Sequence, residues 1–331
     1  MLTRRSALAG AATMAAAATV PNALFAQAGY PDHPIRIIVG YAAGGGVDII
    51  ARMLGEPIKA ALGQPVVVEN RTGAAAMIAS NAVAKAPPDG YTLLAAASGE
   101  VAINQHLYGT KMTYDPAKEL VPLALVGIVP CVVVVAESTP VRNPKELIAY
   151  ARANAGKLSF SSSGVGNPQQ LAGELMNSMA GINVLHVPYK GSAPAVTDVA
   201  TGAVTMSFSS LAAALPLIQA GKLRAVAVTS KERMPQLPDV APLAEGDPKL
   251  AGYELLNWFA IFGTAGTPAP IIDRLNGIIN AALKDQATVD KLMPQGIVPK
   301  TLSPAEFKSF VAAETEKFGK IVTAANIKLE N

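Results

Sequence analysis

The spacing of apolar residues changes abruptly within residues 35–54. Residues 35–39 read IRIIV, which is typical of a buried strand in a parallel sheet. Over residues 47–54 the apolar positions recur at helical spacing instead. Three glycines, at 44–46, lie between the two patterns. The stretch therefore predicts a strand, a tight glycine turn and a helix in immediate succession.

The same alternation continues along the chain. Apolar strand patterns alternate with segments of helical spacing, and Gly- or Pro-rich turns separate them. Such alternation is typical of βαβ units, in which helices cover both faces of a parallel sheet. The sequence thus predicts an α/β fold of mostly parallel sheets flanked by helices. We expect strands at 65–70, 91–97, 158–161, 183–188, 204–208 and 223–229, and helices at 75–85, from 143, from 169, up to 201, up to 220, at 269–283 and at 303–325.

Two segments break this alternation and predict crossings between lobes. Residues 120–137 are a long apolar stretch interrupted by Pro122 and Pro130, and prolines suit a crossing or edge strand better than a central one. Residues 253–263 have the pattern of a return crossing. A mature chain of about 300 residues exceeds the usual size of one core, so two lobes are expected. The predicted division is 29–128 plus 254–331 for the first lobe and 129–253 for the second, with hinge crossings near 128 and 253.

The first 28 residues have the composition of a cleavable export signal. Arg4 and Arg5 precede an Ala-rich run, and Ala26-Gln27-Ala28 offers small residues at the cleavage site. The twin arginines resemble a Tat signal, and a Sec signal with two basic residues looks similar. A retained membrane anchor is the alternative, but the run is short and rich in alanine. We therefore predict cleavage near 26–28 and a soluble periplasmic protein.

Charge and cysteine content restrict the classes of partner. Without Arg4 and Arg5 the chain has 25 basic and 24 acidic residues. This near-neutral balance argues against nucleic acid and against a membrane surface as partners. The single cysteine, Cys131, lies in an apolar run and cannot form a disulfide within one chain. It is expected to be a small buried side chain.

The glycine turn at 44–46 has the chemistry of an anion cradle. Without Cβ atoms its backbone takes positive φ and a ligand can approach its N–H groups. Those groups lie at a helix N-terminus, where such donors lack partners. A Walker A loop is excluded because Gly46 and Val47 stand where Lys and Ser/Thr are required, and a dinucleotide fingerprint is weak because the glycines are contiguous. A plain tight turn is the alternative to any ligand role.

Motifs of common enzymes are absent from the sequence. It contains no G-x-S-x-G, H-E-x-x-H or C-x-x-C, and its three histidines are too scattered to predict a metal site. Asp48 and Glu100 are candidate acids near the predicted carboxyl edge of the sheet, and Asp48 is expected to serve the helix dipole. We predict no catalytic residue, no metal and no cofactor. The loops at that edge carry glycines and hydroxyl groups, which suit a carboxylate: Ser98, Ser161, Ser162, Ser163, Ser192, Ser209 and Ser210.

Longer segments carry a specific family likeness. The chain resembles the Bug-type, or tripartite tricarboxylate transport, extracytoplasmic solute-binding proteins in IRIIVGYAAGGGVDIIAR, KLSFSSSGVGNPQQLAGEL, HVPYKGSAPAVTDV and AGKLRAVAVTS, among others. The likeness runs in order from residue 30 to the C-terminus. The segments HVPYKGSAPA and AGKLRAVAVTS carry most of its specificity.

The resemblance implies a two-lobed periplasmic-binding-protein fold of type II with a hinge and a ligand cleft between the lobes. It implies a monomeric receptor that binds a small organic acid and delivers it to the membrane permease subunits of a tripartite transporter. In that family, a ligand carboxylate is held by backbone groups and water between the glycine loop of one lobe and the Ser/Gly loop of the other. The predicted ligand-binding residues are Tyr41, Ala43, Gly44, Gly45, Gly46, Ser98, Ser162, Ser163, Gly166, Asn167, Phe208 and Ser209.

Departures from the family pattern bear on the ligand. Some members have an acid near position 209, suited to a ligand ammonium group, where this chain reads Phe208-Ser209-Ser210. A mono- or dicarboxylate is therefore expected, aromatic acids included, with Tyr41, Met77 and Phe208 against its apolar body. Two other hypotheses stay open. One is a secreted α/β enzyme or nucleotide-binding protein that uses Gly44–Gly46 as a phosphate cradle, and the other is a signalling receptor.

Overall fold

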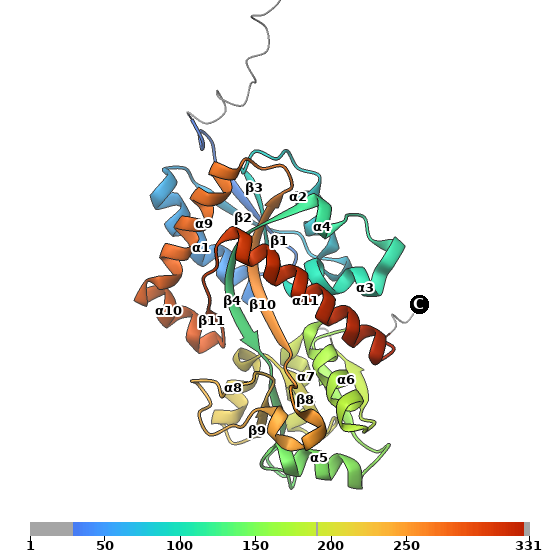
Figure 1. The fold of residues 1–331 in the computed structure, drawn as a ribbon. Coiled ribbons are helices and arrows are strands. Elements are labelled where there is room, and N and C mark those ends of the chain that lie inside the picture. Colours follow the sequence, from blue (N-terminus) through green and yellow to red (C-terminus); the bar gives the residue numbers. More distant parts are fainter. Residues whose placement is uncertain (1–28, 190, 328–331) are drawn as a thin grey trace, which may run out of the picture.

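The computed structural model describes residues 29–189 and 191–327, so the export signal predicted at 1–28 lies outside the described residues. Two lobes are seen, each with its own β-sheet and flanking helices (Figure 1). The expected two-lobed α/β fold is confirmed. No helix in 29–189 or 191–327 combines the length and apolar character that a membrane crossing needs.

The sheet of the first lobe has six strands in the order β11-β4-β10-β3-β1-β2. The strand β1 pairs in parallel with β2 on one side and β3 on the other. Strand β10 pairs antiparallel with both β3 and β4, and β11 pairs antiparallel with β4. The bounds are β1 Ile35–Val39, β2 Val66–Asn70, β3 Thr92–Ala97, β4 Leu120–Pro130, β10 Leu256–Thr264 and β11 Val298–Pro299.

The sheet of the second lobe has five strands in the order β7-β6-β8-β5-β9. Strand β6 pairs in parallel with β7 and β8, whereas β5 pairs antiparallel with β8 and β9. The bounds are β5 Val132–Ala136, β6 Ser159–Ser162, β7 Leu185–Pro188, β8 Met206–Ser209 and β9 Leu223–Val228.

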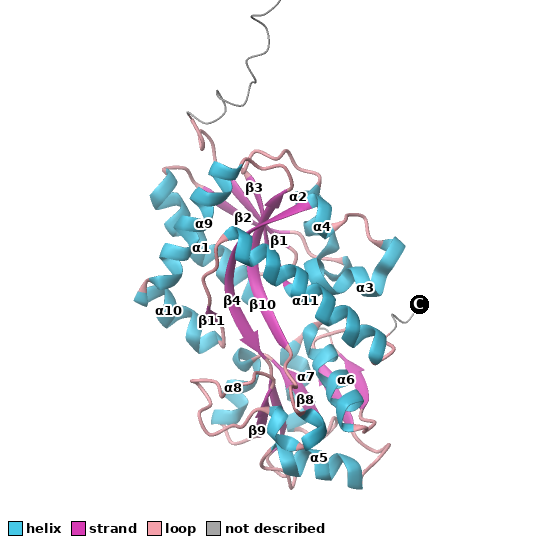
Figure 2. Ribbon diagram, in the orientation of Figure 1, coloured by secondary structure: helices cyan, strands magenta, loops and turns pink. Residues whose placement is uncertain are grey.

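Both sheets are mixed, but most of their strands run in one direction, as expected: β10 and β11 run opposite to the other strands of the first sheet, and β5 runs opposite to the others of the second. The predicted alternation of strand and helix holds for β1 to β3 and again for β6 to β8, where the pairing is parallel. The long strands β4 and β10 run in opposite directions along the molecule and link the two sheets (Figure 2). The chain leaves the first sheet along β4 and re-enters it along the adjacent β10, so these two strands pair antiparallel.

The two chain crossings between the sheets are hydrogen-bonded to one another through Thr229. Strand β4 ends at Pro130 and β5 begins at Val132, with the buried Cys131 between them. The Cys131 N–H donates to the Thr229 hydroxyl (2.8 Å), and the Thr229 N–H donates to the Cys131 carbonyl (3.0 Å). The Leu255 N–H, directly before β10, donates to the Thr229 carbonyl (3.0 Å). The two connections therefore form one bonded strip.

Several of the helices that cover the sheets begin at side-chain caps. The Asn143 side chain accepts from the Glu146 N–H at the start of α5, and Ser303 and Glu306 form a capping box at the start of α11. The first lobe contains α1 Gly46–Leu62, α2 Met77–Ala84, α3 Asn104–Tyr108, α4 Pro116–Glu119, α9 Ala269–Lys284, α10 Gln286–Leu292 and α11 Pro304–Ala324; the second contains α5 Pro144–Ala153, α6 Pro168–Ala180, α7 Ser192–Ala200 and α8 Leu211–Gln219.

The long helix α11 joins the cores of the two lobes. It crosses the face of the first sheet and its C-terminal end reaches α6 of the second lobe (Figure 1). Its Phe307 packs edge-on against the fully buried Trp258 of β10, with ring centroids 6.2 Å apart. Burying aromatic side chains of this size contributes a large share of core stability. One continuous cluster of buried apolar residues consequently extends from the first sheet into the second.

Candidate functional site

The predicted glycine turn connects β1 directly to α1. Gly44 has φ +82°, a conformation that glycine adopts without strain. Gly46 lies against the ring of Phe259, and a Cβ atom at Gly46 would come within 2.7 Å of that ring. These two glycines are therefore required by backbone conformation and by close packing. Residues 42–44, at the tip of the turn, are exposed.

The first turn of α1 has free N–H donors. Its N-cap is Gly45, which has no side chain to accept a hydrogen bond, whereas α5, α6 and α11 have side-chain caps. Within 29–189 and 191–327, the N–H groups of Gly46, Val47 and Asp48 have no hydrogen-bond acceptor. Backbone donors at a helix N-terminus attract anions because the helix dipole adds to their partial charges. The predicted anion cradle thus has its donors in place.

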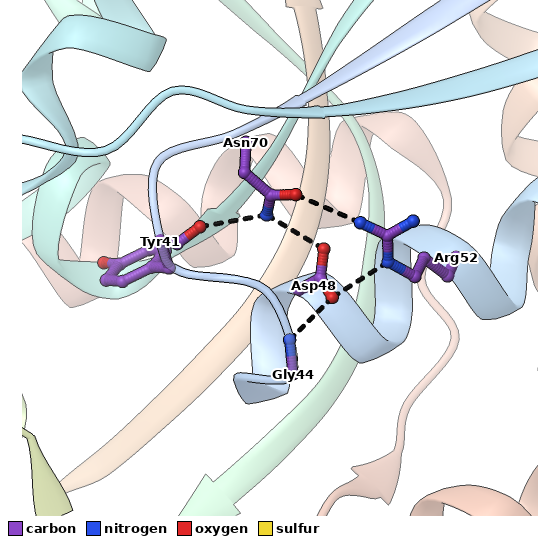
Figure 3. A network of polar contacts seen from close by, with 5 residues as sticks. All are labelled: Tyr41, Gly44, Asp48, Arg52 and Asn70. Carbon is purple, nitrogen blue, oxygen red and sulfur yellow. Dashed lines mark hydrogen bonds and ion pairs between the residues drawn. The ribbon is translucent and has the colours of Figure 1, made fainter.

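The side chain of Asp48, in the first turn of α1, is hydrogen-bonded to the glycine turn (Figure 3). Its Oδ2 accepts from the Gly44 N–H (2.8 Å) and from Arg52 Nε (2.9 Å), and its Oδ1 accepts from Asn70 Nδ2 (2.9 Å). Asn70, at the end of β2, also donates to the Tyr41 carbonyl (3.0 Å) and accepts from Arg52 (3.0 Å). Asp48 lies in the first turn of α1, as expected from the helix dipole. It also ties both ends of the glycine turn to β2.

The charge state of Asp48 follows from these contacts. Burial opposes ionisation, but the hydrogen bonds from Arg52, Gly44 and Asn70 outweigh it and lower the Asp48 pKa to about 2. The carboxylate is ionised at neutral pH and all its contacts are internal. It is a structural anchor of the turn rather than an acid available for chemistry.

Replacing Asp48 by alanine is expected to lower the free energy of unfolding by about 2 kcal/mol, because charge-assisted hydrogen bonds are lost and their donors stay behind. Urea unfolding monitored by circular dichroism measures the change. Glu56→Ala on the exposed side of the same helix is the matched control and should change stability by less than about 0.5 kcal/mol. Equal effects of the two variants would contradict the anchoring role.

Tyr41 joins the glycine turn to the turn after β3. Its hydroxyl donates to Glu100 Oε2 (2.6 Å), and the ring packs at the edge of the first-lobe core. Glu100 lies in the π-helical turn η3 (Gly99–Ile103) and is fully buried. Its Oε1 accepts from the Ala97 N–H (2.8 Å). Both oxygens of this carboxyl are therefore used inside the protein.

Burial raises the pKa of Glu100 to about 7, although the hydrogen bonds from Tyr41 and Ala97 oppose the shift. No cation pairs with Glu100 among the described residues. The two acids singled out in the sequence thus lie beside the same turn, but Asp48 has a cationic partner and Glu100 has none.

Ser98 lies at the carboxyl end of β3, as predicted, and contacts the return strand. Its hydroxyl donates to Asn257 Oδ1 (2.8 Å), which is on β10. The same Asn257 oxygen accepts from the Trp258 N–H (2.8 Å). Ser98 is fully buried, so its hydroxyl is engaged inside the protein.

A left-handed turn of three alanines follows β2 at the same edge. Ala74, Ala75 and Ala76 have φ of +47°, +51° and +65°. This conformation costs non-glycine residues roughly 1–2 kcal/mol each. Asn104 Nδ2 donates to the Ala75 carbonyl (3.0 Å), and Ala76 packs so closely on Gly40 that a Cβ there would lie 2.4 Å from the Ala76 Cβ. Neighbouring contacts therefore hold a strained turn beside the first strand.

The second predicted loop, residues 162–167, is held by two glutamines at the start of α6. Gln169 Oε1 accepts from the Ser163 N–H (2.7 Å) and Gln170 Oε1 accepts from the Gly166 N–H (2.7 Å). Asn167 caps α6 and donates from Nδ2 to the Ser163 hydroxyl (2.8 Å). The Gly164 N–H also donates to the Ser162 hydroxyl (3.3 Å), so the loop is preformed and three of its N–H groups are already paired. The glutamines were missed in the sequence, although their place directly after Asn-Pro was a usable signal.

Ser162 forms a hydrogen bond with His186 that the sequence did not predict. The hydroxyl lies 2.7 Å from His186 Nε2 and also 2.8 Å from the Gly164 carbonyl. Burial lowers the His186 pKa to about 4, and Ser162 is fully buried. In the described chain no carboxylate hydrogen-bonds His186, so nothing orients it as a catalytic base. The pair stabilises the end of β6 and the loop that follows.

Phe208 and Ser209 end β8 and are both buried. Phe208 is 0% exposed and packs edge-on against Phe160 at 5.6 Å between ring centroids. That places it in the core between the sheet and α6, and argues against its prediction as a ligand-lining residue. Ser209 lies opposite Val132 in the antiparallel pair with β5, and its hydroxyl donates to the Ser210 carbonyl (3.3 Å).

The structure thus gathers the predicted residues into two groups, one in each lobe. Tyr41, the glycines at 44–46 and Ser98 surround the carboxyl ends of β1 and β3, while residues 162–167 and Ser209 lie at the ends of β6 and β8. The second group contacts the first lobe at α3, where the Leu107 side chain lies against Gly166. We find no cluster of three potential metal-binding side chains in 29–189 or 191–327.

Comparison with known proteins decides the family. The model for the tripartite tricarboxylate transporter family receptor matches residues 50–327. The chain belongs to this receptor family. Protein BugT of Bordetella pertussis is a relative with 36% identity over 303 residues, covering 91% of this chain and 92% of BugT.

Solved structures of similar proteins extend the family match. Rpa4515 of R. palustris, solved with adipate, has a TM-score of 0.82 and 35% identity, with 90% of this chain and 99% of that chain covered. MatC of Rhodopseudomonas palustris, solved with malate, has a TM-score of 0.77 and 27% identity, with coverages of 88% and 100%. The resemblance expected from the sequence is confirmed, and the chain is a solute-binding receptor of the tripartite tricarboxylate transporter family.

Proposed function

We propose that this receptor captures a small organic carboxylate between its two lobes and delivers it to the membrane subunits of a tripartite transporter. The observation that carries the proposal is the first turn of α1, with a glycine N-cap and free N–H groups at Gly46 and Val47. Adipate in Rpa4515 and malate in MatC support the carboxylate class. Such donors stabilise a carboxylate without a cation or a metal.

The proposed site consists of two jaws. Tyr41, the turn at 43–46 and Ser98 form the first jaw, and the loop at 162–167 with Ser209 forms the second. Phe208 is left out because its ring packs against Phe160 in the core between the sheet and α6. The predicted lobes, 29–128 plus 254–331 and 129–253, stay a proposal. It is supported by the passage of the chain between the sheets at Cys131 and again before β10.

A carboxylate suits the site better than an amino acid. Asp48 and Glu100, the acids of the first jaw, are fully engaged by protein donors and do not offer an oxygen to a ligand ammonium group. The second jaw offers hydroxyls and amides, such as Ser163 and Asn167. A buried ligand ammonium would therefore lack a counter-charge, which is costly.

The cellular setting follows from the proposed role. We place the mature receptor in the periplasm as a monomer, exported by the signal at 1–28 through a Tat-like or Sec route, with no enzymatic activity of its own. The neutral charge balance supports small-molecule ligands over nucleic acid.

A thermal-shift screen of the mature protein tests the ligand class. Adipate, malate, benzoate, an amino acid set and nucleotides are added at increasing concentration. A carboxylate at about 100 times its Kd should stabilise the fold by roughly 2.7 kcal/mol. If only a nucleotide raises the melting temperature, the proposal is wrong and the phosphate-cradle hypothesis gains support. If only amino acids do, the ammonium argument is wrong.

A further inference from the structure

Two buried carboxyl groups fix the position of the glycine turn, and they differ in their counter-charges. Asp48 binds the Gly44 N–H and pairs with Arg52, 2.9 Å away. Glu100 binds the Tyr41 hydroxyl and the Ala97 N–H, and both of those groups are neutral donors. An ionised Glu100 would therefore place an uncompensated negative charge one side chain away from the turn that is to receive an anion.

The groups around Glu100 do not supply a positive charge. Tyr41 faces it from the glycine turn, and the Tyr114 hydroxyl donates to its backbone carbonyl (2.5 Å). The elements packed on η3 add no cation to this carboxyl. Most ionic side chains of these elements are engaged elsewhere in the described chain: His106 with the Thr315 carbonyl, Lys118 with Asp115, Glu119 with Lys85, Glu306 with Ser303, Glu314 with Lys317 and Glu316 with Lys320. Lys308 of α11 is exposed and forms no ion pair with Glu100.

We propose that ligand binding is coupled to a proton on Glu100, so that the glycine turn accepts a carboxylate only while the Glu100 carboxyl beneath it is neutral. The inference rests on the proposed function and adds one condition to it, namely that Glu100 must be protonated when the carboxylate is bound. Like charges brought together in a buried site disfavour double ionisation, so a bound anion and an ionised Glu100 exclude one another. Binding then takes up a proton whenever Glu100 was ionised beforehand.

The expected pH dependence follows from the fraction of receptors that carry this proton. With a pKa of about 7, Glu100 is roughly nine-tenths protonated at pH 6 and one-tenth protonated at pH 8. When only a fraction of the protein is competent to bind, the apparent Kd rises by the inverse of that fraction. The apparent Kd should therefore rise about tenfold from pH 6 to pH 8.

Isothermal titration calorimetry with adipate and with malate, at pH 6 and pH 8, tests the coupling. Glu100→Gln keeps the shape of the side chain and removes the ionisable group, so its Kd should be the same at both pH values. Glu174→Gln is the matched control: burial also raises the pKa of Glu174, but it lies on α6 and does not contact the glycine turn. That variant should retain the tenfold change. Wild-type titrations at pH 8 in buffers of different ionisation enthalpy should show uptake of about one proton per ligand bound.

Tyr41→Phe separates proton coupling from simple support of the turn. The Tyr41 hydrogen bond opposes the rise of the Glu100 pKa, so its removal should move the midpoint of the pH profile to higher pH. If the wild type binds adipate or malate with the same Kd at pH 6 and pH 8, the coupling is overturned and the proposed function stands. The same holds if the Kd of Glu100→Gln changes with pH as that of the wild type does. If no carboxylate binds at either pH, the proposed function fails and the coupling fails with it.

Discussion

Gly45→Val is expected to weaken carboxylate binding by roughly a hundredfold to ten-thousandfold while the protein stays folded. Gly45 is the N-cap of α1 and has φ −76°, which valine also adopts. A Cβ atom there would lie 3.3 Å from the Ala42 carbonyl, which is close but tolerable. The branched side chain would cover the N–H groups of Gly46 and Val47. Losing two hydrogen bonds to a charged ligand costs about 3–6 kcal/mol.

Calorimetry with adipate and malate measures the loss, and circular dichroism checks the fold. Gly277→Ala is the matched glycine replacement, since it lies in α9 with open space around an added Cβ. It should leave binding unchanged and stabilise the helix slightly. Wild-type affinity in Gly45→Val would mean that the glycine turn is only a turn.

The second large effect concerns stability. Between pH 4.5 and pH 8, Glu100 is expected to lower the free energy of unfolding by about 3 kcal/mol relative to Glu100→Gln. Its pKa is about 7 in the folded protein and 4.5 in the unfolded chain. The folded state therefore holds the Glu100 proton more tightly than the unfolded chain does. The contribution of this proton to stability is fully present below pH 4.5 and is lost as the pH rises through 7.

Urea unfolding of wild type and Glu100→Gln across this range isolates the contribution, because all other titrating groups are shared. The difference between the two proteins should grow up to pH 7 and then level off. A constant difference would show that Glu100 is ionised in the folded state at pH 4.5 and above, or that it keeps an ordinary pKa.

The elements around the first jaw could be predicted because local pattern and tertiary context agree there. The apolar run of β1, the glycines and the helical spacing of α1 each specify the same strand, turn and helix, and the structure contains them at Ile35–Val39 and Gly46–Leu62. The helices predicted from 143 and at 303–325 likewise occur, and they begin at the side-chain caps Asn143 and Ser303.

The mixed pairing and the support of the loops could not be predicted in the same way. Strand direction at β4 and β10 depends on how the whole chain crosses between lobes, and local periodicity carries no such information. The left-handed turn at Ala74–Ala76 contradicts the preferences of alanine and persists only through its neighbours. Glu100 and its partner Tyr41 are 59 residues apart in the chain. Long-range contacts of this kind leave no local signal.

Phe208 shows the limit of counting positions from a strand end. The prediction placed it next to Ser209 and against the apolar body of the ligand, but adjacent residues of a strand point to opposite faces. Phe208 therefore turns into the core against Phe160, although its neighbour Ser209 is the last residue of the same strand. A residue-by-residue transfer of a loop requires the register of the strand that precedes it.

The strip of hydrogen bonds through Thr229 marks the place where the second lobe is inserted between two strands of the first. Pro130 and Leu256 are register partners at the ends of β4 and β10, so the polypeptide leaves the first sheet and re-enters it at adjacent positions. The intervening 125 residues, 131–255, have the geometry of a domain inserted into a hairpin loop. Chain termini that lie side by side make such insertions and circular permutations tolerable. The second lobe can accordingly be regarded as an insertion in the first. Without it, a short turn between β4 and β10 would complete the first lobe.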